Sequence, residues 1–274
     1  MLRKTIKAQV SRTGLGISTG EQVTLTLAPA EAGHGLRVKR TDVGVEIPLD
    51  IEHAAEAPNC TAVRLGEHSV FVVEHLLAAL WASGITDLAV SVDHDELPIF
   101  DGSARPLVEM VAEAGTQDLD GEVEPLAVGE AVAFGDEVKL LTALPAEELS
   151  IHYFLDHPHP LIGLDYAVYA PAREAFAARL AGARTFVTED EARQLMASGW
   201  LQAGDEHNAV IVYPDRLSEQ VEHGAFAAHK IVDLLGDLYL LNRPVLAQFM
   251  AFGTGHAENR ALARELARRA ASAT

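Results

Sequence analysis

Residues 229–237, HKIVDLLGD, place four polar side chains within an apolar pattern of helical period. Each helical residue advances by about 100°, so His229 and Asp233 share one face, and Asp237 follows one turn later. An imidazole and a carboxylate at this spacing can bind one divalent ion, because zinc accepts nitrogen and oxygen ligands. A simple hydrogen bond or ion pair on the helix surface is the alternative. A catalytic zinc site usually has three protein ligands, so a third must come from elsewhere in the chain.

Glu74 and His75, in VEHLLAAL, follow the apolar run SVFVV at a point where a strand gives way to a helix. His75 is therefore the candidate third ligand. If it binds the ion, Glu74 can take a proton from the water on that ion, as the general base of a hydrolytic zinc site does. The alternative is that Glu74 only supplies favourable negative charge to the first turn of a helix. The motif HExxH does not occur, which excludes the usual metalloprotease arrangement.

The stretch FGTGHAENR places His256 after a strand, in a glycine-containing turn that opens a helix. A histidine there could protonate a leaving amine or stabilise an oxyanion, with Asp237 as the carboxylate that orients it. A helix cap or a solvent-exposed histidine is the alternative. The tetrapeptide ARTF adds Thr185, whose hydroxyl could donate to an oxyanion, and Phe186, which could pack on a ligand.

Two other polar clusters favour structural roles. The stretch DHDELPIFDGS, residues 93–103, lacks the regularly spaced oxygen ligands of a calcium loop. It is interpreted as the exit of a strand and a turn that caps the next helix. The stretch DHPHP contains His157 and His159, and its prolines predict a rigid loop in preference to a second metal site.

The composition of the chain excludes several further classes of function and site. The chain has 274 residues, is 49% hydrophobic and 22% charged, and carries a formal net charge of −19. This charge opposes nucleic-acid binding, which depends on Lys and Arg at phosphates. Cys60 is the only cysteine, which excludes an internal disulfide and a thiolate zinc cage. The sequence has no membrane-spanning run and no start of signal-peptide type, so we expect a cytoplasmic protein without integral membrane association.

The elements that must position these residues follow the same order twice. In the first half we expect strands over 22–30, 36–42, 45–51 and 61–73, then a helix over 74–84, a strand over 86–92 and a helix over 101–115. The acidic segment 116–125 has no clear period and is the candidate linker. In the second half we expect strands between 127 and 170, helices in 172–182 and 188–199, a strand over 208–213, a helix over 225–242, a strand over 244–252 and a helix over 257–272.

Both halves thus close with helix, strand, helix. His75 lies in the first of these helices in one half, and His229 lies in its counterpart in the other. We therefore predict an α+β fold with two similar domains, residues 1–117 and 126–274, that face each other.

Five motifs, VEHLLAAL, PIFDGSARP, ARTF, HKIVDLLGD and GHAEN, occur in an order and at spacings that resemble the bacterial UDP-3-O-acyl-N-acetylglucosamine deacetylases, zinc amidases of lipid A biosynthesis. The resemblance runs from TGLGISTGEQVTLTL to the C-terminal helix. It implies two similar two-layer α/β sandwich domains with the metal between them. It also implies a UDP-glucosamine substrate that carries a 3-O-hydroxyacyl chain and an N-acetyl group, which is hydrolysed to acetate.

By this resemblance, His75, His229 and Asp233 match the family's zinc ligands, and Glu74 matches its general base. The expected cofactor is therefore Zn²⁺, and the expected partner is the acylated UDP-glucosamine. We expect no nucleic-acid partner and favour a monomer.

The remaining matches concern the transition state and the substrate. Thr185 matches an oxyanion donor, and His256 matches an electrostatic or acid group with Asp237 as its partner. Lys230 matches a substrate-binding residue, and we expect Phe186 to contact the substrate as well.

Three positions depart from the family pattern. Ser18 stands where the family usually has a histidine, Gly253 stands three positions before the matched histidine where a basic residue is usual, and His157 stands where many members have an aromatic residue. A zinc amidase that acts on a different N-acetylated sugar or sugar nucleotide is therefore an alternative. A noncatalytic sugar-nucleotide binding protein with a structural metal is a second alternative.

Overall fold

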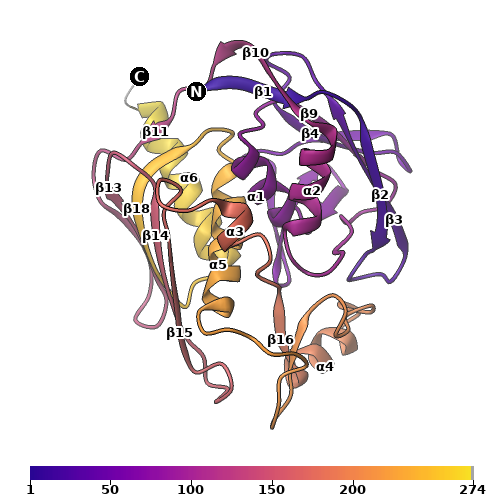
Figure 1. The fold of residues 1–274 in the computed structure, drawn as a ribbon, viewed down its shortest axis with the longest axis vertical. Coiled ribbons are helices and arrows are strands. Elements are labelled where there is room, and N and C mark those ends of the chain that lie inside the picture. The colour runs from indigo at the N-terminus through magenta and orange to yellow at the C-terminus, as the bar shows by residue number, and fades with distance from the viewer. Residues whose placement is uncertain (273–274) are drawn as a thin grey trace.

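The first half of the chain forms a five-stranded sheet with two helices on its inner side (Figure 1). The structure, a computed structural model, describes residues 1–272. The strand order across the sheet is β2 (Val10–Leu15), β3 (Gln22–Pro29), β9 (Leu88–Val92), β4 (Leu36–Arg40) and β5 (Val45–Pro48). Alternate residues of β3, namely Val23, Leu25 and Leu27, are fully buried, as expected for a sheet with one covered face.

The second half repeats this topology. Its main sheet has the order β12 (Val132–Gly135), β13 (Leu140–Pro145), β18 (Val245–Phe252), β14 (Ser150–Asp156) and β15 (Leu164–Tyr169), and β11 (Leu126–Ala127) also pairs with β18. In each five-strand order one parallel pair, β4 with β9 or β14 with β18, is flanked by antiparallel pairs, and the short β11 adds a second parallel pair with β18. The predicted α+β fold with two similar halves is confirmed. The limits 1–117 and 126–274 stay a prediction.

The two halves meet through their counterpart helices, α1 (Glu74–Ser83) and α5 (Ala225–Tyr239), which pack against each other at the centre of the molecule. The close approach requires Gly236, because a Cβ there would lie 2.1 Å from the carbonyl oxygen of Glu74. Helix α1 is buried almost all round, which fits its apolar sequence. The helix crossing therefore brings the start of α1 against the middle of α5.

The outer helices and the helix ends follow ordinary sequence rules. Helix α2 (Arg105–Ala114) packs on α1 and buries residues at positions i, i+3, i+4 and i+7, namely Leu107, Met110, Val111 and Ala114. Helix α6 (His256–Ser272) packs on α5 and on the second sheet. The buried carboxylate of Asp165 in β15 accepts from the backbone N–H groups of Gly224 and Ala227, which caps α5 and fixes it to its sheet.

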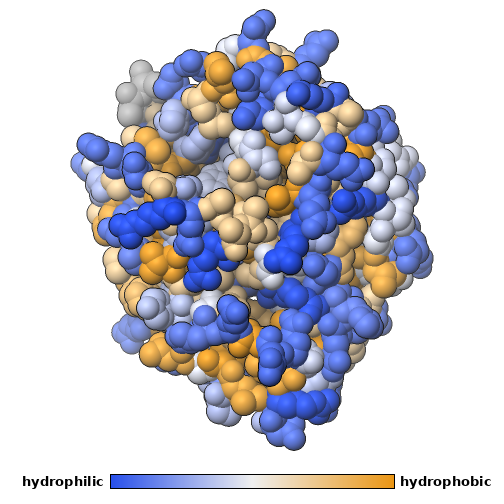
Figure 2. All heavy atoms as spheres, viewed as in Figure 1, coloured by the Kyte–Doolittle hydropathy of each residue, from blue (hydrophilic) through white to orange (hydrophobic). Residues whose placement is uncertain are grey.

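Each half carries an insertion before its central helix. In the first half this is a small sheet of β6 (Ala54–Ala57), β7 (Cys60–Leu65) and β8 (His68–Phe71). In the second half it comprises α3 (Phe176–Arg179), β16 (Phe186–Thr188), α4 (Glu189–Ala197) and β17 (Val210–Val212). The side chains of Thr188 and Glu191 form a capping box at the start of α4. Figure 2 shows a mostly hydrophilic face on which apolar side chains gather toward the lower part, where Figure 1 places β16 and α4.

Some predicted elements were wrong in detail. Most of the candidate linker is β10 (Thr116–Glu122), which pairs antiparallel with β1 (Leu2–Ile6). This partner lies more than a hundred residues away, so local periodicity gave no sign of it. The predicted helix in 172–182 shortens to α3, and the single strand predicted over 61–73 is the hairpin β7–β8. No helix within residues 1–272 is long and apolar enough to cross a membrane.

Candidate active site

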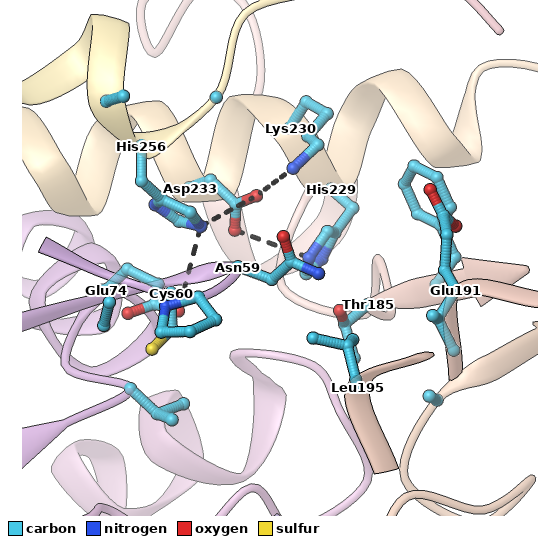
Figure 3. Close-up of a pocket in the computed structure, with 18 of the residues that line it drawn as sticks. Asn59, Cys60, Glu74, Thr185, Glu191, Leu195, His229, Lys230, Asp233 and His256 are labelled. Atoms are coloured by element: carbon cyan, nitrogen blue, oxygen red, sulfur yellow. Dashed lines mark hydrogen bonds and ion pairs between the residues drawn. The ribbon is translucent and has the colours of Figure 1, made fainter. Parts of the chain in front are cut away.

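A cavity of about 550 Å³ lies where the two halves and both insertions meet. Eight of the nine residues that the sequence singled out line this cavity: Glu74, His75, Thr185, Phe186, His229, Lys230, Asp233 and His256. The ninth, Asp237, contacts His256 from behind. In Figure 3, Glu74 enters from the first half, His256 from the start of α6, and Lys230, Asp233 and His229 from α5. Residues that are far apart in sequence are thus brought into one site.

His75, His229 and Asp233 converge on one point. Their ligand atoms all lie within 4.8 Å of one another, and each residue is buried. Asp233 Oδ1 lies 3.8 Å from His75 Nε2 and 3.4 Å from His229 Nε2. The two rings meet edge to face at 5.2 Å, so both Nε2 atoms can face the same small volume. Within residues 1–272 this is the group of histidine, cysteine and acidic side chains with the geometry to hold a metal ion.

The protonation states of the three residues suit a divalent cation. Burial, and then the neighbouring His229, lowers the pKa of His75 to about 3, and burial also lowers the pKa of His229. Both rings are therefore neutral near pH 7. The Nδ1–H of His229 donates to the carbonyl of Ala183 at 3.2 Å, which leaves a lone pair on Nε2 for a metal.

Asp233 completes the donor set as a carboxylate. Burial alone would favour its neutral form, but the nearby ammonium of Lys230 and imidazolium of His256 favour the carboxylate, and its pKa lies well below the usual range. Two neutral imidazoles and one carboxylate match the ligands that zinc takes in hydrolytic sites. The residues present therefore fit a zinc ion.

Glu74 stands beside this group at the first turn of α1. Its Oε2 accepts the backbone N–H of Thr61 at 3.0 Å, and its Oε1 lies 4.0 Å from His256 Nε2. Burial, with smaller contributions from Asp233 and Asp237, raises the pKa of Glu74 to about 7. A carboxylate with a pKa near the working pH is well suited to accept a proton.

An unusual backbone turn precedes Glu74. Val72 has a φ of 63°, in the left-handed region that β-branched residues rarely adopt. Val72 is buried and lines the cavity, and Val73 leads directly into α1. The turn ends the apolar run of β8 abruptly and directs Glu74 and His75 into the cavity, so strain is stored beside the chemical groups.

His256 is the first residue of α6 and is held by Asp237. Its Nδ1 donates to Asp237 Oδ2 at 2.9 Å, and its Nε2 lies 3.8 Å from Asp233 Oδ2. Burial disfavours the charged imidazolium, but Asp237 and Asp233 outweigh burial and raise the pKa of His256 to about 9. His256 is therefore protonated near neutral pH and can donate a proton or stabilise negative charge.

Lys230, Thr185 and Phe186 also line the cavity. Lys230 Nζ donates to Asp233 Oδ2 at 2.9 Å, and although burial opposes its charge, Asp233 raises its pKa. The backbone N–H of Thr185 donates to the carbonyl of Gly102 at 2.8 Å, which fixes the position of its hydroxyl-bearing side chain. Phe186 lies edge to face with Phe226, with ring centres 4.7 Å apart.

The other end of the cavity is apolar and lies between the two insertions. Its lining includes the side chains Ile17, Val72, Ile99, Val187, Leu195, Trp200, Leu201 and Ala209. The backbone N–H groups of Gln202 and Ala203 donate to the carbonyls of Ser18 and Ile17 at 3.2 and 3.1 Å, which joins the second insertion to the N-terminal loop. The cavity thus combines a charged end with an apolar end.

The positions that depart from the family pattern also surround the cavity. Ser18, Gly253 and His157 line it, and Gly253 has a φ of 57°, which glycine adopts without strain. Lys139 reaches the cavity from the β12–β13 turn, but its Nζ lies 3.7 Å from Glu258 Oε1. Of the two clusters interpreted as structural, the first has Asp101 accepting from the backbone N–H and hydroxyl of Ser103, which caps the turn before α2. In the second, His157 Nδ1 accepts the backbone N–H of His159 at 3.1 Å, although His157 also lines the cavity.

Several residues at the site were not predicted from the sequence. Thr61 and Arg260 are buried beside Asp237 and Glu74, and Asn259 donates to Asp237 Oδ2 at 2.9 Å. Arg260 is four residues after His256, a helical spacing that could have flagged it. Thr61 sits in a strand and reaches its partners only through tertiary folding.

The sequence also matches a known protein family. The family model for LpxC, described as UDP-3-O-acyl N-acetylglycosamine deacetylase, matches residues 3–268. This range includes every residue that lines the cavity. The similarity is thus not confined to the motifs around the metal group.

Curated proteins named UDP-3-O-acyl-N-acetylglucosamine deacetylase are similar over nearly the whole chain. The protein of Anaeromyxobacter sp. (strain Fw109-5) is 37% identical over 96% of this chain and 88% of its own length. The protein of Chlamydia felis (strain Fe/C-56) is 35% identical over 96% of both chains. The protein of Helicobacter hepaticus (strain ATCC 51449 / 3B1) is 30% identical over 97% of this chain and 90% of its own length.

Proposed function

We propose that this chain, which belongs to the UDP-3-O-acyl-N-acetylglucosamine deacetylase family, hydrolyses its substrate with a zinc ion held by His75, His229 and Asp233. The chain is a hydrolase of lipid A biosynthesis that removes the N-acetyl group of UDP-3-O-(3-hydroxyacyl)-N-acetylglucosamine and releases acetate. The observation that carries the zinc proposal is the convergence of three buried ligand atoms beside Glu74. A zinc ion bound there would polarise the amide carbonyl and lower the pKa of a water.

Glu74 is the proposed general base. Its Oε2 is occupied by the backbone N–H of Thr61, so Oε1 is the oxygen free to take a proton from the attacking water. The raised pKa of Glu74, about 7, lets it accept this proton near neutral pH and release it later in the reaction.

His256 and Thr185 act on the groups that develop charge. The imidazolium of His256 holds a proton at Nε2, the atom nearest Glu74 Oε1, and donates it to the departing amine. The Thr185 hydroxyl donates to the carbonyl oxygen as it becomes an oxyanion. Asp237 keeps the His256 ring oriented through its bond to Nδ1.

Substrate binding uses both ends of the cavity. We propose that the ammonium of Lys230 binds an anionic or hydroxyl part of the substrate and that the Phe186 ring packs on it, since both side chains line the charged end. The apolar end, with Ile17, Leu195 and Trp200, offers a dry surface for the 3-hydroxyacyl chain.

A second candidate function is suggested by Ser18 and Gly253. Gly253 provides no cation for a diphosphate, and Lys139 nearby is already paired with Glu258. An amidase of the same chemistry that acts on another N-acetylated sugar or sugar nucleotide would need fewer cations. Parallel assays with the acylated UDP-sugar and with simple N-acetyl sugars separate the two. Efficient turnover of the acylated UDP-sugar alone would remove the second candidate.

Replacing Glu74 with Gln tests the proposed chemistry. The amide keeps the size of the side chain but cannot take a proton, so we expect kcat to fall by about 10² to 10⁴-fold while one equivalent of zinc stays bound. The matched control is Glu109→Gln on the exposed face of α2, which should keep full activity. Full acetate release by Glu74→Gln would contradict the assignment. A cytoplasmic location and a monomeric state stay predictions, which fractionation and size-exclusion chromatography test.

A further inference from the structure

Thr61, in β7, contacts both the proposed base and the carboxylate that holds the proposed acid. Its backbone N–H donates to Glu74 Oε2 at 3.0 Å, and its hydroxyl donates to Asp237 Oδ1 at 2.5 Å. The residue is fully buried, with 0% of its surface exposed. It therefore stands behind the cavity wall, where it can act on its neighbours but not on the substrate.

The direction of each hydrogen bond around Thr61 is fixed by the donors present. Asp237 accepts from His256 Nδ1 and from Asn259 Nδ2 at one oxygen, each at 2.9 Å, so the Thr61 hydroxyl hydrogen points at the other oxygen. The lone pairs of Thr61 Oγ1 then accept from Arg260 Nη1 at 3.1 Å and face His256 Nδ1 at 3.2 Å. The result is a directed chain from the Arg260 guanidinium through the Thr61 hydroxyl to the Asp237 carboxylate.

This chain links groups that come from opposite halves of the molecule. Glu74 and Thr61 belong to the first half, and Asp237, His256 and Arg260 belong to the second. The proposed base and the proposed acid therefore face each other across the two halves, with Glu74 Oε1 4.0 Å from His256 Nε2. We propose that Thr61 is a positioning residue that sets this distance by holding Glu74 with its backbone and Asp237 with its side chain. The proposal rests on the proposed function of this site.

The consequence of losing the hydroxyl follows from the contacts. Asp237 would keep its hydrogen bonds to His256 and Asn259 on one oxygen but lose its partner on the other. The carboxylate could then rotate about the Cβ–Cγ bond. The His256 ring is held by that carboxylate and its Nδ1 also lies 3.2 Å from Thr61 Oγ1, so the ring would lose a direct contact and turn with the carboxylate. Removal of a group that orients active-site residues in this way typically lowers activity by about 10 to 100-fold. Substrate affinity should change little, because Thr61 has no exposed surface.

The test compares variants that differ in the hydroxyl. Thr61→Ser keeps it, Thr61→Val replaces it with a methyl of similar size, and Thr61→Ala differs from Thr61→Ser by the hydroxyl alone. We expect Thr61→Val and Thr61→Ala to lower kcat for acetate release by about 10 to 100-fold, with KM within about twofold and one zinc per chain retained. We expect Thr61→Ser to restore kcat to within about threefold of the wild type.

A matched control separates positioning from stability. Thr5 in β1 is also fully buried, and its hydroxyl accepts the backbone N–H of Ala30 at 3.1 Å, away from the cavity. Thr5→Val should lower the midpoint of thermal unfolding and leave kcat within about twofold of the wild type. If Thr61→Val does not fold, the Ser and Ala pair carries the test.

The outcomes are distinct. Wild-type kcat in Thr61→Val or Thr61→Ala, or equal losses in Thr61→Ser and Thr61→Ala, would overturn the positioning role. A loss that appears only in KM would overturn it as well. Failure of the proposed function would show itself separately, as a wild-type chain that binds zinc but releases no acetate from the acylated UDP-sugar.

Discussion

Helices α1 and α5 occupy the same place in two halves of equal topology, yet they contribute to the site in different ways. Helix α5 passes the site with its middle turns and presents His229, Asp233 and Lys230 from one continuous element. Helix α1 only begins there, and it presents Glu74 and His75 from its first turn. The α5 residues are placed by helical spacing alone, whereas the α1 residues depend on the strand that leads into them.

This difference assigns different tasks to the two helices. Residues spaced along a rigid helix keep their relative positions, which suits metal binding. A residue at a helix start can be set by contacts from neighbouring segments, and Glu74 takes such contacts from Thr61 and from the turn at Val72. We infer that α5 provides the fixed part of the site and α1 the adjustable part.

The largest expected effect comes from the fixed part. His229→Ala should lose the metal and reduce acetate release to the uncatalysed background, because two remaining ligands hold zinc poorly. Metal content by mass spectrometry and the initial rate measure both changes. His152→Ala, in β14 on the outer side of the second sheet, is the control and should keep metal and activity. A His229→Ala protein with a full complement of zinc would show that the helix is not the main metal-binding element.

Removal of the Thr185 hydroxyl should have the next largest effect. Thr185→Val keeps the shape of the side chain but removes a donor to the oxyanion, so we expect kcat to fall by about 10² to 10³-fold. Zinc content and KM should stay near the wild-type values, while Thr185→Ser should recover most of the rate. An unchanged kcat in Thr185→Val would exclude this hydroxyl from transition-state binding.

Gly236→Ala tests the crossing of the two helices itself. The added methyl would lie 2.1 Å from the carbonyl oxygen of Glu74, so α1 must move away from α5. We expect a loss of about 1 to 3 kcal/mol in the free energy of unfolding, measured by urea titration. The displacement of Glu74 from the metal ligands should lower kcat by about 10²-fold. Ala227→Gly in the same helix is a control for helix propensity, and equal kcat in the two variants would argue against this account.

The pH dependence of kcat/KM should show the smallest effect, and it distinguishes the proposed base, Glu74, from the proposed acid, His256. Glu74 must be ionised to accept a proton, and burial raises its pKa to about 7, so kcat/KM should rise with pH up to about 7. His256 must be protonated to donate, and its pKa of about 9, set by Asp237 and Asp233 against burial, predicts a fall in kcat/KM above about pH 9. Asp237→Asn should move the upper limb to lower pH by more than the lower limb, because Asp237 is the main group that raises the pKa of His256 and only a minor contributor to the pKa of Glu74. A shift of the lower limb alone would reverse the two assignments.

Much of the site could be predicted from sequence because α5 carries its residues at helical spacing. The pattern of His229, Asp233 and Asp237 on one face needs only the period of a helix. His75 and Glu74 could be found because the pattern changes from strand to helix between Val73 and Leu76. Both patterns are local in sequence, so they can be recognised without knowledge of the fold.

The residues that the sequence did not reveal depend on long-range contacts. Thr61 reaches Asp237 across 176 positions, and Arg260 reaches Thr61 across 199. The pairing of β1 with β10 is also long-range, which explains why 116–125 read as a linker. The left-handed turn at Val72 has no sequence signature either, since a valine gives no reason to expect it.

The central claim is that α1 and α5 together hold one zinc ion that the reaction requires. The most direct measurement is acetate release from the acylated UDP-sugar by protein stripped with a chelator and titrated with zinc. We predict no activity in the stripped protein and a recovery that rises in proportion to zinc up to one equivalent per chain, but no recovery in His75→Ala or His229→Ala at the same zinc concentrations. Full activity of the stripped protein, or recovery of wild-type activity by either variant at the same zinc concentrations, would contradict the claim.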